Sequence, residues 1–190
     1  MKVTVIISIY NNIPFLKVVL DSLQLQTEKD FEIVVSEDGE NPDVKTFLNQ
    51  YPFSQPWQHL TQKDEGWRKN KAMNNAIRAS KANWLIFIDG DCVLHRKFVE
   101  MHLRYADENS ILAGKRVKLD DASSQLILKD SSKIKSLQEL LIRRLFFGRG
   151  GLRYIEEGIF ISPDGLMGFI PKIRTLNHLT GSNMSFSKKA

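Results

Sequence analysis

Short apolar runs separated by amphipathic segments fill the first half of the chain. The runs at residues 3–9, 31–35 and 84–88 have the length and composition of strands that are buried on both faces of a sheet. The segment 15–23 carries apolar residues at helical spacing, and the asparagine pair before it can cap a helix. The pattern therefore predicts a strand, a helix and a second strand at the start of the chain.

The same alternation continues to about residue 117. We expect helices at 42–51, 70–80 and 98–105, and two further strands, one over 57–62 at the edge of the sheet and one over 111–117. Strands that alternate with helices in this way form parallel sheets with right-handed connections. The predicted fold class is α/β, with a Rossmann-like, mostly parallel sheet and helices on both of its faces.

The pattern changes after Leu119. The stretch 131–153 is rich in lysine and arginine, and apolar residues recur through it at helical spacing. A basic amphipathic helix can lie on an anionic membrane surface, although a packed helix with a solvated basic face is the more common case. The segment 179–187 alternates between apolar and polar residues and predicts a strand that returns to the sheet.

Composition places the chain among soluble globular proteins. It has 190 residues, of which 42% are hydrophobic and 26% charged, and no apolar run is long enough to span a membrane. The first seven residues indicate a strand and not a signal peptide. Cys92 is the only cysteine, which excludes an internal disulfide and fits a reducing, cytoplasmic compartment. The net charge of +5 suits anionic partners without distinguishing nucleotides, nucleic acids and lipid headgroups.

Two carboxylates separated by one glycine end the apolar run at 84–88. Ligands of open α/β sheets bind just beyond the carboxyl ends of the strands, so Asp89 and Asp91 are expected at a ligand site. Oxygen ligands of this kind suit Mg²⁺ or Mn²⁺, which often bridge carboxylates to phosphates. The hypothesis is a metal ion held against a diphosphate, and the alternative is an ordinary acidic turn with solvated charges.

Two more polar clusters follow predicted strands, at 36–40 and at 64–71. Because all three clusters come after parallel strands, we expect them at the same edge of the sheet. Asp38 could accept a hydrogen bond from a base or a ribose, and the second cluster supplies cations for phosphate. These cations are Arg68, Lys69 and Lys71. Neither the P-loop pattern nor the dinucleotide fingerprint is present in the sequence.

Five ordered segments resemble the nucleotide-sugar-binding half of family-two glycosyltransferases, which have the GT-A fold. The segments are 3–11, 36–39, 66–77, 87–91 and 181–186. The resemblance implies metal-assisted transfer of a sugar, with inversion, from a nucleotide sugar to an acceptor hydroxyl. It implies a UDP-sugar donor, a glycan or lipid-linked acceptor of the kind used in polysaccharide biosynthesis, and no nucleic-acid partner.

The resemblance also implies roles for individual residues. The strand end at Ile9 and Tyr10 would border the uracil, Asp38 would contact the base and Asp89 the ribose. Asp91 would bind the Mn²⁺ or Mg²⁺ that bridges the diphosphate. Met73 stands where many members carry an arginine, so the remaining donor-binding predictions are Arg68 or Lys71 at the diphosphate and Asn183 on the side of the donor sugar and the acceptor.

The catalytic base is unknown from the sequence. Family-two enzymes usually carry this carboxylate some way after the glycine–asparagine segment, and the sequence ends at Ala190. We therefore expect the base beyond Ala190, a chain that binds UDP but turns over poorly, and an incomplete acceptor-side region. The expected domain organisation is a nucleotide-sugar-binding region at 1–118 followed by the start of the acceptor-side region at 119–190.

Three alternatives stay open. One is a non-catalytic module that binds a nucleotide sugar, and the second is a nucleotidyltransferase, although its glycine-rich basic loop is missing after the first strand. The third is contact with a membrane or nucleic acid through 131–153, which would make a cytoplasmic protein membrane-associated. Trp67 could stack on a sugar or a base, or fill the edge of the core. Glu37 and Glu65 are alternative bases, although acids in exposed loops are mostly solvated.

Overall fold

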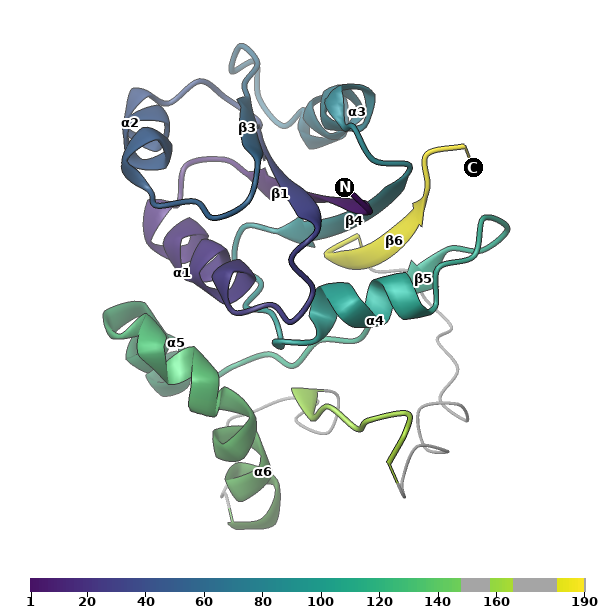
Figure 1. Ribbon diagram of the computed structural model, residues 1–190. Coiled ribbons are helices and arrows are strands. Elements are labelled where there is room, and N and C mark those ends of the chain that lie inside the picture. The colour runs from purple at the N-terminus through teal and green to yellow at the C-terminus, as the bar shows by residue number, and fades with distance from the viewer. Residues whose placement is uncertain (148–157, 166–180, 190) are drawn as a thin grey trace. The chain divides into compact units, whose positions relative to one another are not determined.

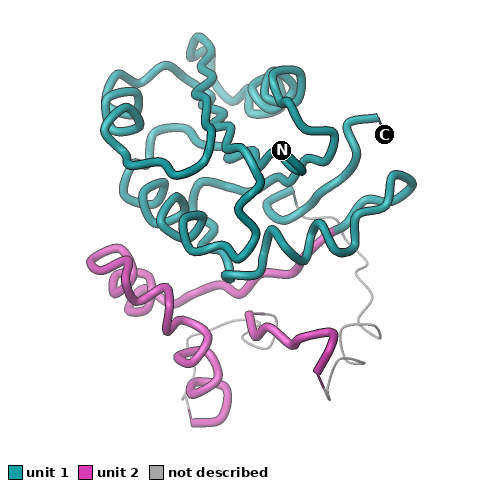
Figure 2. The backbone as a smooth tube through the Cα atoms, in the orientation of Figure 1, with its two compact units in different colours: residues 1–112, 181–190 teal, residues 113–180 magenta. Residues whose placement is uncertain are grey.

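A computed structural model describes residues 1–147, 158–165 and 181–189 of the chain. The chain divides into two compact units. The first joins residues 1–112 to 181–190, and the second comprises residues 113–180 (Figure 2). The first unit is therefore built from two segments that lie far apart in the sequence.

A six-stranded sheet organises the chain, with the strand order β3-β2-β1-β4-β6-β5 (Figure 1). β1 pairs in parallel with β2 and β4, and β2 pairs in parallel with β3. β6 pairs antiparallel to β4, so the predicted mostly parallel sheet is confirmed with one reversed strand. The strands are β1 Val3–Ile9, β2 Phe31–Glu37, β3 Trp57–Leu60, β4 Trp84–Asp89, β5 Leu112–Ala113 and β6 Asn183–Ser187.

Helices cover both faces of this sheet, as predicted. They are α1 Ile13–Gln24, α2 Pro42–Gln50, α3 Lys69–Ala79 and α4 Phe98–Arg104. Side chains of β1 alternate between the two faces: Val5 packs in the core beneath α1, α2 and α4, while Ile6 packs with Ala76 of α3. Both layers are buried, which explains why the central strands are continuously apolar.

Local capping starts the first two helices where the sequence predicts them. The Asn12 side chain accepts a hydrogen bond from the N–H of Phe15 at 3.3 Å, and Asn41 accepts from the N–H of Asp43 at 2.8 Å. A proline occupies the first turn of each helix, where no hydrogen-bond donor is needed. The loops after β1 and β2 are therefore short and leave the strand ends open.

The strand predicted over 111–117 is much shorter than expected, since β5 contains only Leu112 and Ala113. Lys115 and Arg116 interrupt the apolar pattern there, and no long buried face remains. The strand predicted within 179–187 is present as β6. Its register places Ser187 opposite Trp84 and Asn183 opposite Ile88.

The second unit contains one helix that the sequence analysis does not predict, α5 Asp121–Lys129. It is followed by a 3₁₀ helix, η1 Ser131–Ser136, and by α6 Leu137–Phe147. Within the predicted basic stretch, Ile134 and Leu141 are buried, while Leu145 is exposed. The basic residues at 149 and 153 lie outside the described residues. None of the helices that the structure describes combines the length and the apolar character that crossing a membrane requires.

Candidate functional site

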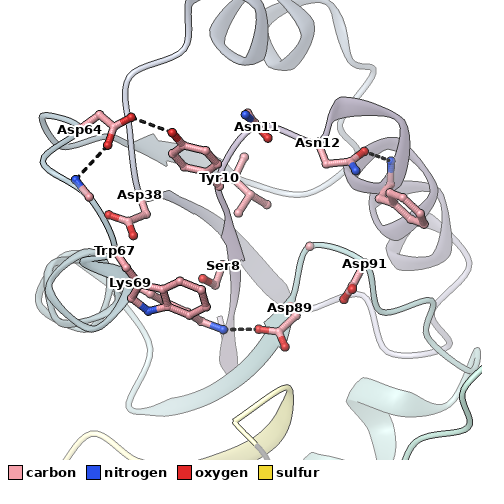
Figure 3. Close-up of a pocket in the computed structure, with 14 residues that line it drawn as sticks. Ser8, Tyr10, Asn11, Asn12, Asp38, Asp64, Trp67, Lys69, Asp89 and Asp91 are labelled. Carbon is pink, nitrogen blue, oxygen red and sulfur yellow. Dashed lines mark hydrogen bonds and ion pairs between the residues drawn. The ribbon is translucent and has the colours of Figure 1, made fainter.

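A cavity of about 510 Å³ lies at the carboxyl ends of β1, β2 and β4 (Figure 3). These strands are parallel neighbours, so their ends open at the same edge of the sheet. The cavity is lined by Ser8, Ile9, Tyr10, Asn11, Asn12, Phe15, Asp38, Asp64, Gly66, Trp67, Lys69, Asp89, Gly90 and Asp91. Five of the predicted site residues are among them, namely Ile9, Tyr10, Asp38, Asp89 and Asp91.

Asp38 ties the loop between β3 and α3 to the end of β2. Its Oδ1 accepts a hydrogen bond from Gln62 Nε2 at 2.7 Å, and its Oδ2 accepts from the backbone N–H of Arg68 at 2.8 Å. The residue is only 8% exposed, so both bonds are largely shielded from water. Asp38 therefore shapes the wall of the cavity before any ligand arrives.

Asp64 lies in the polar cluster at 64–71 and lines the cavity, but the sequence did not predict a binding role for it. It accepts a hydrogen bond from the Tyr10 hydroxyl at 2.8 Å and another from the N–H of Gly66 at 3.2 Å (Figure 3). The Tyr10 bond is the main reason why the pKa of Asp64 is lowered, and the same bond raises the pKa of Tyr10. Asp64 is thus ionised at neutral pH and holds the Tyr10 ring at the carboxyl end of β1.

Lys69 is the cation that reaches the cavity. Its Nζ lies 2.5 Å from Asp89 Oδ1, and it is the only lysine or arginine among the described residues that line this cavity. Arg68 instead pairs with Glu65 at 2.6 Å, and Lys71 is exposed on α3. Lys69 and Lys71 point away from each other because two residues turn an α-helix by about 200°. The roles predicted for Arg68 and Lys71 stay predictions, but neither residue lines the cavity.

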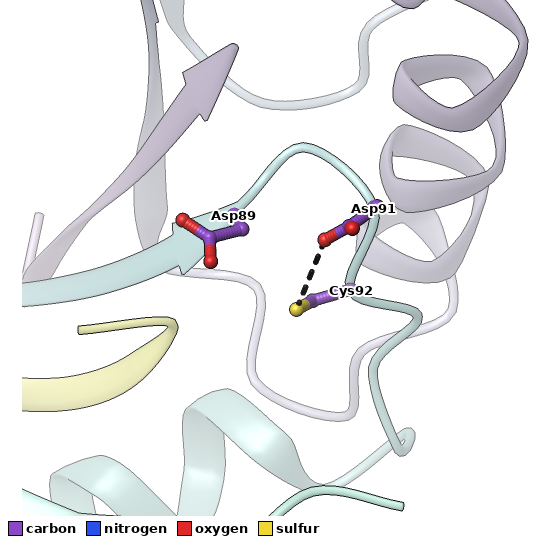
Figure 4. A group of neighbouring side chains, drawn as sticks. All are labelled: Asp89, Asp91 and Cys92. Carbon is purple, nitrogen blue, oxygen red and sulfur yellow. Dashed lines mark hydrogen bonds between the residues drawn. The ribbon is translucent and has the colours of Figure 1, made fainter. Parts of the chain in front are cut away.

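Asp89, Asp91 and Cys92 form a group that could hold a metal ion, with one ligand atom from each within 4.8 Å of the others (Figure 4). The Cys92 thiol donates a weak hydrogen bond to Asp91 Oδ1 at 3.6 Å. Burial, followed by the charges of Asp91 and Asp89, raises the pKa of Cys92 to about 12. The thiol is therefore protonated, and the two carboxylates fit a hard cation such as Mg²⁺ or Mn²⁺ better than a thiophilic one.

Gly90 allows the turn between these two carboxylates to pack against β1. Its N–H donates to the Ser8 carbonyl at 2.8 Å. A Cβ at this position would lie 2.5 Å from Ile9 Cγ2 and 3.1 Å from the same carbonyl oxygen. Only a residue without a side chain fits this close approach.

Asn183 lies beside the end of β4 and not in the cavity lining. In the register of β6 it stands opposite Ile88, one residue before Asp89. Its Oδ1 accepts from Nε2 of His102 at 3.0 Å, and Nδ1 of His102 lies 2.7 Å from the Ser185 hydroxyl. Burial lowers the pKa of His102 to about 4, so the ring is neutral and joins α4 to β6.

Glu37 and Glu65, the two alternative bases, do not line the cavity. Glu37 is fully buried and accepts from the N–H of Asn41 at 2.6 Å, and its other oxygen lies 2.7 Å from His59 Nε2. Glu65 forms an ion pair with Arg68. The cavity lining thus contributes four carboxylates, Asp38, Asp64, Asp89 and Asp91, and one ammonium group.

The family model described as "Glycosyl transferase family 2" matches residues 4–172. Chondroitin synthase from Escherichia coli is 25% identical over 151 residues, which cover 77% of this chain and 22% of the synthase. The chain spans about a fifth of the length of the curated relatives that it matches.

Two solved structures share the fold. One is the mannosyltransferase PcManGT from Pyrobaculum calidifontis in complex with GDP-Man and Mn²⁺, with a TM-score of 0.57, 15% identity and coverage of 99% of this chain and 45% of that one. The other is S. aureus TarS 1–349 in complex with UDP-GlcNAc, with a TM-score of 0.50, 21% identity and coverage of 60% and 34%. The α/β architecture with a mostly parallel six-stranded sheet is that of GT-A glycosyltransferases.

Proposed function

Because the chain belongs to glycosyl transferase family 2, we propose that its cavity holds a UDP-sugar and that the protein transfers the sugar, with inversion and with the help of a metal ion, to an acceptor hydroxyl. The observation that carries the proposal is the meeting of Asp38, Lys69, Asp89 and Asp91 in one cavity at the ends of parallel strands. The complexes of PcManGT with GDP-Man and Mn²⁺ and of TarS with UDP-GlcNAc support this choice of ligand.

The donor would lie across the cavity with its base at Ile9, Tyr10 and Asp38. Its ribose and diphosphate would lie toward Asp89 and Asp91, which stand across the cavity from Asp38 (Figure 3). Lys69 would meet a phosphate oxygen from the same side, and it is the cation that this role needs because neither Arg68 nor Lys71 lines the cavity. Asn183, beside the end of β4, would face the donor sugar and the acceptor.

Asp89 and Asp91 would hold Mg²⁺ or Mn²⁺, which supplies Lewis-acid stabilisation to a departing diphosphate. The cavity also needs a cation on electrostatic grounds. Four carboxylates line it against one ammonium group, and a diphosphate adds further negative charge. Asp89 already pairs with Lys69, and a metal ion beside Asp91 would offset the remaining negative charge at the end of β4.

In the proposed reaction, the acceptor hydroxyl attacks the anomeric carbon as the bond to the diphosphate breaks, and a base takes the hydroxyl proton. The base stays unassigned. The proposed acceptor is a glycan or a lipid-linked glycan, in line with the chondroitin synthase relative. Membrane contact through 131–153 also stays a proposal. Within its described part, Phe146 and Phe147 of α6 are exposed next to basic Arg143.

The test is calorimetric titration of UDP into the parent chain and into Asp91→Asn, with Mn²⁺ and with a chelator. We expect binding by the parent that depends on metal, and a loss of about tenfold or more in the variant, because one carboxylate of a two-carboxylate site is removed. Asp43→Asn, an exposed site in the first turn of α2, is the matched control and should bind like the parent. Equal affinity with chelator would contradict the metal site, and no binding of UDP or another nucleotide would contradict the donor site.

A further inference from the structure

Trp67 is a large aromatic side chain that is exposed to solvent at the rim of the cavity. It is 90% exposed and lines the cavity from the loop between β3 and α3. The structure therefore rules out the interpretation that this indole fills the edge of the core. The other two tryptophans are packed: Trp84 is 7% exposed in β4, and Trp57 stacks on Phe53 with ring centroids 4.5 Å apart. An exposed indole at a concave site is more typical of ligand binding than of folding.

The backbone on both sides of Trp67 is anchored. The next residue, Arg68, donates its N–H to Asp38, and the preceding residue, Gly66, donates its N–H to Asp64. Gly66 has a φ of +85°, a conformation that glycine adopts without strain and that turns the chain here. The hydrogen-bonded backbone of the loop therefore holds the indole in its exposed position.

A second aromatic residue lies near it. Tyr10, at the end of β1, is 53% exposed, and its ring lies 3.7 Å from the position that a Cβ at Gly39 would take. Its hydroxyl is bound by Asp64, which also holds Gly66. One carboxylate thus fixes the Tyr10 ring and the backbone next to Trp67. The Asp38 carboxylate lies in the same part of the cavity, and Asp91 lies across it (Figure 3).

We propose that Trp67 is a donor-binding residue, whose indole stacks on the nucleobase bound beside Tyr10 and Asp38. The inference rests on the proposed function and deepens it. A planar base offers a π-face to an aromatic ring, and the polar groups that could contact its edge are at the Asp38 end. The competing position is on the diphosphate and sugar side, because Figure 3 draws the indole beside Lys69, whose Nζ contacts Asp89. The titrations below distinguish the two positions.

The experiment compares Trp67→Ala, Trp67→Phe and the control Trp57→Phe in calorimetric titrations with uridine, UDP and UDP-GlcNAc in the presence of Mn²⁺. Stacking on the base predicts that Trp67→Ala weakens all three ligands by a similar factor, about tenfold. Trp67→Phe should restore most of the affinity, and Trp57→Phe should bind like the parent. Since Trp67 packs on nothing in the core, its variants should unfold at the parent's temperature.

Intrinsic tryptophan fluorescence gives a second readout. Ligand should change the emission of the parent and of Trp57→Phe, and should leave the emission of Trp67→Phe nearly unchanged. A loss of affinity confined to UDP-GlcNAc would place the indole at the sugar and overturn the proposal. Parent-like binding by Trp67→Ala would overturn it while the proposed function stands. No binding of any ligand by the parent would overturn both the stacking role and the proposed function.

Discussion

Gly90 shows how much of the candidate site depends on one missing side chain. The two carboxylates of the proposed metal site flank it, and its backbone rests on β1 through the bond to the Ser8 carbonyl. The space that a methyl group would need is already occupied by Ile9. The spacing of the two carboxylates is therefore coupled to the packing of the neighbouring strand.

At this scale we predict that Gly90→Ala destabilises the protein by about 1–3 kcal/mol, because the added Cβ forces Ile9 or the end of β1 to shift. The free energy of unfolding from urea denaturation measures the effect. The metal-dependent affinity for UDP should fall as well, since the shift moves Asp89 or Asp91.

Gly181→Ala is the matched control, because nothing lies within 4 Å of the Cβ it would add. Its stability should stay within about 0.5 kcal/mol of the parent. Equal stability of the two alanine variants would show that the turn at Gly90 relaxes without cost.

At the scale of elements, His102 is a polar connection between α4 and β6. The ring is buried at 8% exposure and contacts both Asn183 and Ser185 of the strand. A neutral imidazole can accept a hydrogen bond at one nitrogen and donate at the other, and these two neighbours match that arrangement. The ring therefore fixes the side chain of Asn183 next to the end of β4.

Acid should weaken this connection. The pKa of His102 is about 4 in the folded chain and about 6.5 in the unfolded chain. The unfolded chain therefore binds the extra proton first, and stability is complete above pH ~6.5 and falls by up to about 3 kcal/mol as the pH drops to ~4.

Urea unfolding across this pH range tests the prediction in the parent and in His102→Gln. The variant should lose less stability between the two pH values, because it has no imidazole to protonate. Other titrating groups act in both proteins, so the difference between the two curves reports on His102. Parallel curves would contradict a buried neutral histidine.

The elements near the site could be predicted to different extents. Continuous apolar runs that end in acidic residues, such as the one before Asp89, predicted both the buried strands and a ligand site at their carboxyl ends. The orientation of Lys69 could not be predicted, because it depends on the residue at which α3 begins, and a sequence pattern does not define a helix boundary to the single residue. α5 had a usable signal in Asp120, whose side chain caps it by accepting from the N–H of Ser123.

The pairing of strands that lie far apart in the sequence could not be predicted either. The alternation within 179–187 indicates a strand, but not its partner or direction, because both depend on contacts with residues about a hundred positions earlier. The structure supplies them: β6 runs antiparallel to β4, and Phe186 stacks on Phe87 with centroids 4.9 Å apart. The position of Asp38 at the cavity could be predicted from the end of β2 alone. Its hydrogen bonds to the β3–α3 loop could not, because they depend on the tertiary structure.

At the scale of the whole molecule, the sheet unit is completed by residues from the far end of the chain. β6 covers the edge of β4 and contributes fully buried Ser185. We predict that a variant in which a flexible Gly-Ser linker replaces residues 114–180 still unfolds cooperatively and binds UDP with Mn²⁺, because the first unit is compact by itself.

The matched comparison is a chain that ends at residue 112. It lacks β6, so the edge of β4 loses its paired strand and Phe87 loses its stacking on Phe186, and the chain should aggregate or fail to unfold cooperatively. Circular dichroism and size-exclusion chromatography distinguish the two results. An unfolded linker variant would show that the sheet unit depends on residues 114–180.

The pairing of β4 with β6 also makes the length of the intervening chain thermodynamically unimportant. The entropy lost in closing a flexible loop grows only with the logarithm of its length, so each doubling costs about 0.6 kcal/mol. The contacts between the two strands are the same whatever connects them. Insertions and exchanges between β5 and β6 can therefore accumulate over evolution at little cost to the sheet, and one sheet can be joined to many different neighbouring structures.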